Sequence, residues 1–303
     1  MLHTSGFTKR QTVFEIRKVM SHHFGDLTER LEGITDPRKR KSYKISELLM
    51  EAMMMYIFKE GSRNSFNQDR AESNFRKNYR RIFGLDLPHM DTVDTVLRRI
   101  KPSELSALKQ ALIRQLVIRR VLRRFKLFKK YFCVSVDATW YANFGKEAPY
   151  AGCLYRVSKN DKKTYLQPIL EAKIVGHNGF SLSIATEWML NGEEYEKQDC
   201  ELKAFKRLAA QLKKCFPRLP ICILADGLYP NKSVFDICHN NGWEFIITLK
   251  DNQLKDVWTE VGVFEQLYSK NILLHEKVVN KTQTILRELD FGQNGNWGTG
   301  KLG

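Results

Sequence analysis

The chain has 303 residues, a hydrophobic fraction of 43% and a net charge of +16 at pH 7. This length and apolar content allow two domains of ordinary size with packed cores, which excludes an intrinsically disordered protein. The charge is unevenly distributed: residues 1–130 hold 29 basic and 14 acidic residues, whereas residues 131–303 hold 21 and 20. A basic first half indicates a polyanionic partner or an anionic surface.

The cysteines and the apolar windows argue against secreted and membrane-spanning classes. The six cysteines form no C-x-x-C pair and lie mostly in apolar runs such as YFCVSV, which is typical of buried thiols in a reducing compartment. The start MLHTSGFTKRQ has no apolar signal-peptide core, and the most apolar window, residues 48–58, is well short of the roughly 20 residues of a membrane span. We therefore expect a cytoplasmic protein without a membrane partner.

Residues 1–130 are predicted to be mostly helical, because their apolar residues recur at spacings of three and four. One helix is expected around residues 45–56, where a cluster of methionines would fill the core. In LDLPHMDTVDTVLRRI, Asp91 is predicted to cap a short helix that ends in Arg98 and Arg99. This helix could contact DNA in the manner of a helix-turn-helix, or it could be an ordinary capped helix with a basic end.

A long helix is predicted from Pro102 to Lys130, and its second half is strongly basic. Its apolar side could lie on a membrane or bind an acidic partner, but phosphate binding is the preferred interpretation, given the rest of the sequence. The DNA-binding residues predicted here, in addition to Arg98 and Arg99, are Arg119, Arg120, Arg123, Arg124, Lys126, Lys129 and Lys130.

From Tyr131 onwards the sequence alternates short β-rich runs with turns. Three strands are expected in YFCVSVDATWY, YLQPILEAKIVG and FSLSIATEWML, followed by a helix over residues 197–216. A fourth strand, ICILADG, a short helix after Pro230 and a fifth strand, WEFIITLK, complete the order β-β-β-α-β-α-β. This order predicts an α/β fold with a mixed sheet flanked by helices, and it is the order of the ribonuclease H-like fold.

Two aspartates occupy informative places in these strands. Asp137 lies inside the apolar first strand and Asp226 at the end of the fourth, where an ionised carboxylate is costly unless it pairs or binds a cation. The first and fourth strands are expected to be neighbours at the sheet centre, so the two carboxylates could meet. Such a pair suits Mg²⁺ or Mn²⁺, and two such ions can assist the attacking and leaving oxygens of a phosphodiester. Taken singly, each aspartate could be an ordinary strand-end or turn residue.

From about residue 45 to residue 261 the chain resembles bacterial insertion-sequence transposases of the DDE type. The resemblance is carried by VSVDATWY, LEAKIV, SIATEWM, YEKQDCELKAFKRLA, LPICILADGLYPN and FIITLKDN, preceded by EGSRNSFNQDR and LPHMDTVDTVL. Such enzymes are similar in having a first Asp in a D-x-T context, here Asp137, and a second in an A-D-G-x-Y context, here Asp226. The resemblance implies that these two residues are catalytic metal ligands.

The activity implied by the resemblance is cleavage of DNA at the ends of a mobile element, followed by strand transfer into target DNA. It also implies double-stranded DNA as partner, a homodimer or larger synaptic assembly, and a place in the bacterial cytoplasm at the nucleoid. A nuclease of the same fold that hydrolyses DNA without strand transfer is the rival within this class.

The third acid of the family does not occur in its usual context. The late candidates are Glu260, Glu265, Glu276, Glu288 and Asp290, and Glu187 on the third strand is a fallback. The run KTQTILRELDF is expected to form a strand, and the glycine-rich ending FGQNGNWGTGKLG after it suggests a shortened or frame-shifted reading frame. The rival function is therefore a truncated, inactive transposase that only binds DNA.

Three parts are expected along the chain. Residues 1–130 form a basic, all-α DNA-binding domain. Residues 131–260 form the ribonuclease H-like catalytic core. Residues 261–303 begin an incomplete β-rich insertion or are a frame-shifted tail.

Overall fold

The computed structural model describes residues 9–191, 198–250, 253–267, 272–279 and 282–289. The chain forms two compact units, one of residues 1–225 and 233–246, the other of residues 226–232 and 247–303. Within the described ranges, no helix combines the length and the apolar character needed to cross a membrane.

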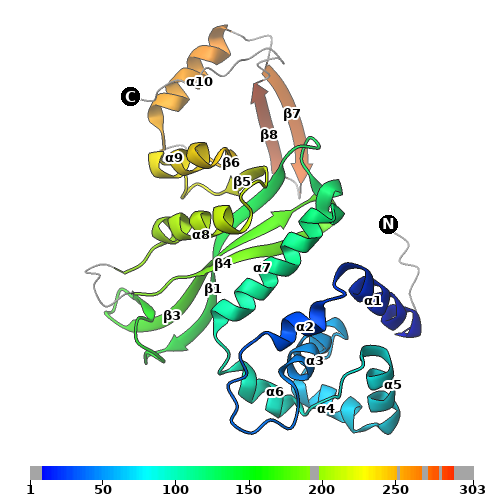
Figure 1. The fold of residues 1–303 in the computed structure, drawn as a ribbon. Coiled ribbons are helices and arrows are strands. Elements are labelled where there is room, and N and C mark those ends of the chain that lie inside the picture. Colours follow the sequence, from blue (N-terminus) through cyan, green and yellow to red (C-terminus); the bar gives the residue numbers. More distant parts are fainter. Residues whose placement is uncertain (1–8, 192–197, 251–252, 268–271, 280–281, 290–303) are drawn as a thin grey trace. The chain divides into compact units, whose positions relative to one another are not determined.

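Most of the described residues before Pro102 are helical (Figure 1). Their buried apolar side chains form one hydrophobic core. The predicted methionine helix is confirmed, since Met50 and Met54 are buried among the leucines of this core. Tyr56, which the same spacing assigned to the apolar side, is exposed. The helices are α1 (Lys9–His23), α2 (Leu27–Glu32), α3 (Ile45–Ile57), α4 (Arg63–Ala71), α5 (Ser73–Phe83) and α6 (Met90–Leu97).

The start of α6 differs from the prediction. The N-cap is His89, whose Nδ1 accepts a hydrogen bond from the backbone N–H of Asp91 at 3.3 Å, so the assignment of the cap to Asp91 is wrong. The helix begins earlier because Met90 is fully buried and has to lie on the same helical face as the apolar residues that follow. Asp94 forms ion pairs with Arg98 and Arg63, both at 2.9 Å.

The long basic helix predicted over residues 102–130 is also wrong in its second half. Helix α7 spans Pro102–Ile118, Arg120 then takes a left-handed φ of 60°, and a short 3₁₀ helix, η1, covers Val121–Phe125. A continuous helix would set like charges four residues apart, as at positions 119 and 123. The break also lets Phe125 stack on Phe180, with ring centroids 3.7 Å apart. The basic residues after Ile118 therefore do not continue helix α7. We call the segment that holds them, residues 119–130, the basic turn.

The sheet that follows is mixed. Its strand order is β2-β3-β1-β5-β6, and β4 pairs with β3 as well. β1 is antiparallel to β3 and parallel to β5, so the predicted neighbours at the sheet centre are confirmed. β2 was not predicted, because its four residues are too few to show an alternation. The strands are β1 (Phe132–Gly145), β2 (Leu154–Val157), β3 (Lys163–Val175), β4 (Ser181–Trp188), β5 (Ile221–Ala225) and β6 (Glu244–Ile247).

Helices flank this sheet on two faces (Figure 1). Helix α8 (Glu201–Cys215), the helix expected over residues 197–216, contacts β3 and β4 through an apolar stripe in which Phe205 and Leu208 are fully buried. Helix α7 contacts β4 from the other face, where the Nζ of Lys109 donates hydrogen bonds to Ser183 and Thr186. Helix α9 (Lys232–Asn241) connects β5 to β6. The expectation of a mixed sheet flanked by helices is confirmed, and the ribonuclease H-like assignment stays a prediction.

The second unit holds a helix and a two-stranded sheet. Helix α10 spans Lys255–Leu267, and β7 (Ile272–Val279) pairs antiparallel with β8 (Thr282–Leu289). The strand expected in KTQTILRELDF is confirmed as β8, whereas β7 was not predicted. The glycine-rich ending lies outside the described residues, and the domain boundaries at 130 and 260 stay predictions.

Candidate active site and nucleic-acid interface

Asp137 lies within β1 at an exposed position, so the expectation that burial makes its charge costly is wrong. Its register partner is Glu171 on β3, which is itself paired with Thr186 on β4. Side chains of directly paired residues point to the same face of an antiparallel sheet, so these three share one face. This is the face that α7 contacts, because Lys109 donates a hydrogen bond to Thr186 Oγ1 at 3.0 Å.

The charges around Asp137 are balanced by pairing. Burial acts to raise the pKa of Glu171, but its hydrogen bond with Ser183 and its 3.1 Å ion pair with Lys173 outweigh burial and leave the pKa below its ordinary value. Burial lowers the pKa of Lys109, against the attraction of Glu171. Within the described part of the chain, no hydrogen bond or ion pair engages the side chain of Asp137.

Asp226 directly follows β5 and is exposed. Its Oδ1 accepts a hydrogen bond from the backbone N–H of Leu228 at 2.9 Å, which closes a tight turn. The side chain of Lys250 packs closely on the next residue, Gly227, since a Cβ there would lie 2.7 Å from Cε of Lys250. Gln253 also donates a hydrogen bond to the carbonyl of Gly227. Gly227 of the ADGLYPN motif therefore packs against Lys250 of the FIITLKDN motif within the second unit.

Asp137 and Asp226 follow strand positions that are paired with each other in the sheet. β1 and β5 pair in parallel up to Ser135 and Leu224. Asp137 is two residues beyond Ser135, and Asp226 is two residues beyond Leu224. The two aspartates belong to different compact units, and their joint metal site stays a prediction.

The fallback acid Glu187 lies on the other face of the sheet. Glu187 is paired with Leu170 on β3, and Leu170 is paired with Ala138 on β1. Leu170 and Ala138 are the immediate sequence neighbours of Glu171 and Asp137. One step along a strand reverses the face, so Glu187 is directed away from Asp137. Its carboxylate is held by Arg207 of α8, and the interpretation of Glu187 as the third acid is therefore wrong.

The late acids, Glu260, Glu265, Glu276, Glu288 and Asp290, stay candidates for the third acid because of their place in the sequence. Glu260 is exposed on α10. The side chains of Glu265, Glu276 and Glu288, and all of Asp290, lie outside the described residues. Among the residues that can be described, no group of three or more His, Cys, Asp or Glu side chains is arranged to hold a metal ion.

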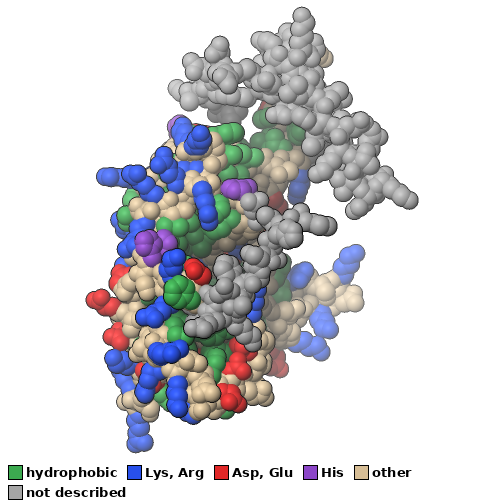
Figure 2. Space-filling view, turned by 90° about the vertical axis from the view of Figure 1, so that its right-hand side faces the viewer, with side chains coloured by type: hydrophobic (Ala, Val, Ile, Leu, Met, Phe, Trp, Pro, Cys, Tyr) green, Lys and Arg blue, Asp and Glu red, His purple; other side chains and the backbone are tan. Residues whose placement is uncertain are grey.

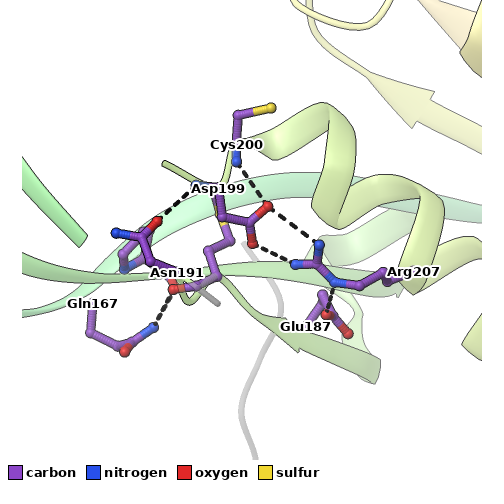
Figure 3. Close-up of polar contacts among 8 residues, drawn as sticks. Gln167, Glu187, Asn191, Asp199, Cys200 and Arg207 are labelled. Atoms are coloured by element: carbon purple, nitrogen blue, oxygen red, sulfur yellow. Dashed lines mark hydrogen bonds and ion pairs between the residues drawn. The ribbon is translucent and has the colours of Figure 1, made fainter. Parts of the chain in front are cut away.

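Arg207 is the centre of a polar network that connects α8 to β4 (Figure 3). Its guanidinium donates to Glu187 and to Asp199, with Nη2 2.6 Å from Oδ2 of Asp199. The backbone N–H of Asp199 donates to Oδ1 of Asn191 at 3.0 Å. These hydrogen bonds, the one with Asp199 above all, raise the pKa of Arg207. The network joins the chain on either side of residues 192–197.

Replacing Arg207 by Met is expected to destabilise the protein by about 1–3 kcal/mol, because Asp199 is almost fully buried and loses its charged partner. The methionine keeps most of the aliphatic packing of the arginine stem. Urea unfolding measures the change, with the exposed neighbour Lys206→Met as control. Equal unfolding midpoints for the two variants would show that the network contributes no stability.

The basic turn after α7 forms one wall of a groove with a volume of about 850 Å³. The opposite wall is the segment of residues 216–220, between α8 and β5. The lining residues that the structure describes include no Asp or Glu. The cationic side chains of this basic groove are Arg114, Arg120, Arg123, Lys126, Lys129 and Arg218.

The groove contains four of the predicted DNA-binding residues and adds Arg114 and Arg218, which were not among them. Arg218 follows α8, far along the chain from the basic turn, and neither its spacing nor its neighbours connected it to that turn in the sequence. The pairing of β1 with β5, in which Phe132 lies beside Ile221, brings these cations together.

The other predicted DNA-binding residues lie elsewhere. Arg98 is paired with Asp94, and Arg119 donates a hydrogen bond to the carbonyl of His22. Arg124 and Lys130 each lie over the aromatic ring of the following residue, 4.8 and 4.5 Å from its centroid. Arg99 is exposed. Lys and Arg side chains also recur elsewhere over the face shown in Figure 2, with hydrophobic side chains between them.

Comparison with known proteins gives a distant structural likeness. No protein-family model matches the chain, and no curated protein matches it. Among solved structures, the chain is similar to a cryo-EM structure of the piggyBac transposase synaptic complex with hairpin DNA, with a TM-score of 0.39 and 12% sequence identity over 82% of this chain. The chain spans about half of that transposase chain, 53% of its length.

Proposed function

We propose that this chain is a DDE-type transposase that cleaves DNA at the ends of an insertion sequence and transfers the strand, with Asp137 and Asp226 holding Mg²⁺ or Mn²⁺. The observation that carries the proposal is the parallel register of β1 and β5, in which Ser135 pairs with Leu224. Asp137 follows Ser135 by two residues, and Asp226 follows Leu224 by two residues. Positions two apart on a strand share a face, so Asp137 lies on the same face of β1 as Ser135. Each aspartate also lies in a motif of the family that the sequence resembles.

The donor chemistry fits a hard divalent cation, which prefers carboxylate oxygens and keeps several waters. Asp137 is exposed and without a described partner, and Asp226 uses one oxygen in its turn. The ion, when bound, supplies the Lewis acidity that assists the attacking and leaving oxygens of a phosphodiester. Asp137 would hold it from within β1, which is paired with a neighbouring strand on both sides, and Asp226 from directly after the end of β5.

We assign the basic groove to the phosphate backbone of DNA. Six cations line one groove, and its described lining includes no acid. They produce a positive electrostatic potential that attracts a polyanion. Binding of this kind releases counterions and is steeply salt-dependent. The groove therefore supports double-stranded DNA, at the element ends and at the target, as the partner. We further propose that two or more copies act together on a pair of ends, in the bacterial cytoplasm at the nucleoid.

Replacing Arg123 and Lys126 together by Gln is expected to reduce the slope of log Kobs against log salt by about 1–2, because two phosphate contacts are lost. Fluorescence anisotropy of a labelled 30-base-pair duplex at several salt concentrations measures the slope. The control is the pair Lys159→Gln and Lys162→Gln, which removes the same charge from an exposed turn. An equal change in both double variants would mean that the groove has no special role.

The function is tested by incubating the purified chain with plasmid DNA that carries the sequences flanking its coding region, with Mg²⁺ or with EDTA. The proposal expects nicks at the element ends that need the metal, followed by joining of the freed ends to other DNA. Salt-sensitive DNA binding without nicks would instead support the rival function, a truncated transposase that only binds DNA. Nicking without joining would support a nuclease.

A further inference from the structure

The segment of residues 126–131 forms a tight turn with an exposed phenylalanine at its tip. The backbone N–H of Leu127 donates to the carbonyl of Tyr131 at 2.7 Å, and that of Lys130 donates to the carbonyl of Leu127 at 2.9 Å. Between them Phe128 and Lys129 take left-handed φ values of 48° and 59°. Phe128 is 85% exposed, more than any other large hydrophobic side chain in the described part of the chain.

This turn is unfavourable for the isolated protein in two ways. Two consecutive residues with a side chain occupy a backbone region that glycine and asparagine tolerate better. The ring of Phe128 meanwhile gains nothing from burial. Strained and exposed residues of this kind are found where a ligand is bound more often than elsewhere.

The residues on either side fix the turn and supply positive charge. The Nζ of Lys126 lies 5.1 Å from the ring centroid of Phe132, and the Nζ of Lys130 lies 4.5 Å from that of Tyr131. Lys126 and Lys129 also line the basic groove. A phosphate backbone that follows the groove therefore passes the turn that carries Phe128.

We propose that Phe128 is a wedge that inserts between two stacked bases of the DNA bound along the basic groove. Apolar side chains flanked by Lys or Arg open base steps in this way, and the opened duplex bends. The inference rests on the proposed binding of DNA and adds to it a local distortion of the duplex. A lipid surface would also accept a ring between lysines, but the neighbouring cations line a groove, which fits a strand of phosphates better than a plane.

The test uses the full chain and a set of 30-base-pair duplexes from the element ends, each with one 2-aminopurine at a different position. Unstacking raises the fluorescence of this base. The native chain is expected to raise it several-fold at one or two adjacent positions, and Phe128→Ala is expected to abolish the rise. The salt slope of binding should stay unchanged, because no phosphate contact is lost. Phe128→Leu should keep part of the rise, since leucine also serves as a wedge.

Phe14→Ala is the matched control, because this ring is 65% exposed on α1 and lies away from the turn along the chain. Salt-dependent binding with no fluorescence rise at any position would overturn the wedge and leave the DNA-binding function standing. No binding to any duplex would overturn both. Binding of the chain to phosphatidylserine vesicles that Phe128→Ala removes, with no effect on 2-aminopurine, would assign the ring to a membrane instead.

Discussion

Asp137→Asn and Asp226→Asn are each expected to lower metal-dependent cleavage of plasmid DNA by about 100-fold or more. An amide offers one neutral oxygen where a carboxylate offers two with a full charge, and loss of a group that only supports a metal ligand already costs about 10–100-fold. Both side chains are exposed, so the substitutions should leave folding intact. Densitometry of nicked and supercoiled plasmid over time measures the rate.

The matched control for these variants is Asp161→Asn, which removes the same charge. Asp161 is exposed in a turn with φ of 54°, a conformation that asparagine tolerates well. Each of the three variants should bind the 30-base-pair duplex as the native chain does, or slightly more tightly, because a negative charge is lost. Native cleavage rates in Asp226→Asn would remove this residue from the metal site, whatever the result for Asp137→Asn.

Glu51→Gln is expected to abolish a steep loss of stability between pH 4.5 and pH 8. Glu51 on α3 is fully buried, and neither carboxylate oxygen has a described hydrogen-bond partner. Burial raises its pKa from 4.5 to about 8, against the attraction of Arg70. The folded state keeps a proton that the unfolded state releases, so stability is greatest below pH 4.5 and is lost as pH rises towards 8. The loss amounts to about 1.4 kcal/mol per pH unit.

At pH 8.5 the Gln variant is expected to be more stable than the native chain by about 2–4 kcal/mol, after the cost of its own unpaired amide. Urea unfolding from pH 5 to pH 8.5 measures both stability curves. Glu29→Gln, an exposed glutamate on α2, is the control and should keep the native slope. A native stability curve that is flat over this range would show that Glu51 has a partner in solution.

The secondary structure could largely be predicted from local pattern, and its failures have specific causes. Helix α8 and strand β1 each bury one side, so their apolar residues recur with the period of a helix or a strand. This periodicity is visible in the sequence and predicted both elements. The run from Arg119 to Lys130 has acceptable helical spacing, yet it breaks at Arg120. The stacking of Phe125 on Phe180, 55 residues later in the chain, decides that break, and no local window contains it.

The candidate site also has features that the sequence predicted and features that only the tertiary structure shows. By itself the sequence indicated the candidate chemistry: a basic first half, and two aspartates in or directly after apolar strands. Only the tertiary structure decided which residues meet. The strand register placed Glu187 on the face opposite Asp137, and the pairing of the start of β1 with β5 brought Arg218 beside the basic turn. Composition and period are local properties of a chain, whereas a shared face or groove depends on contacts between segments far apart in sequence.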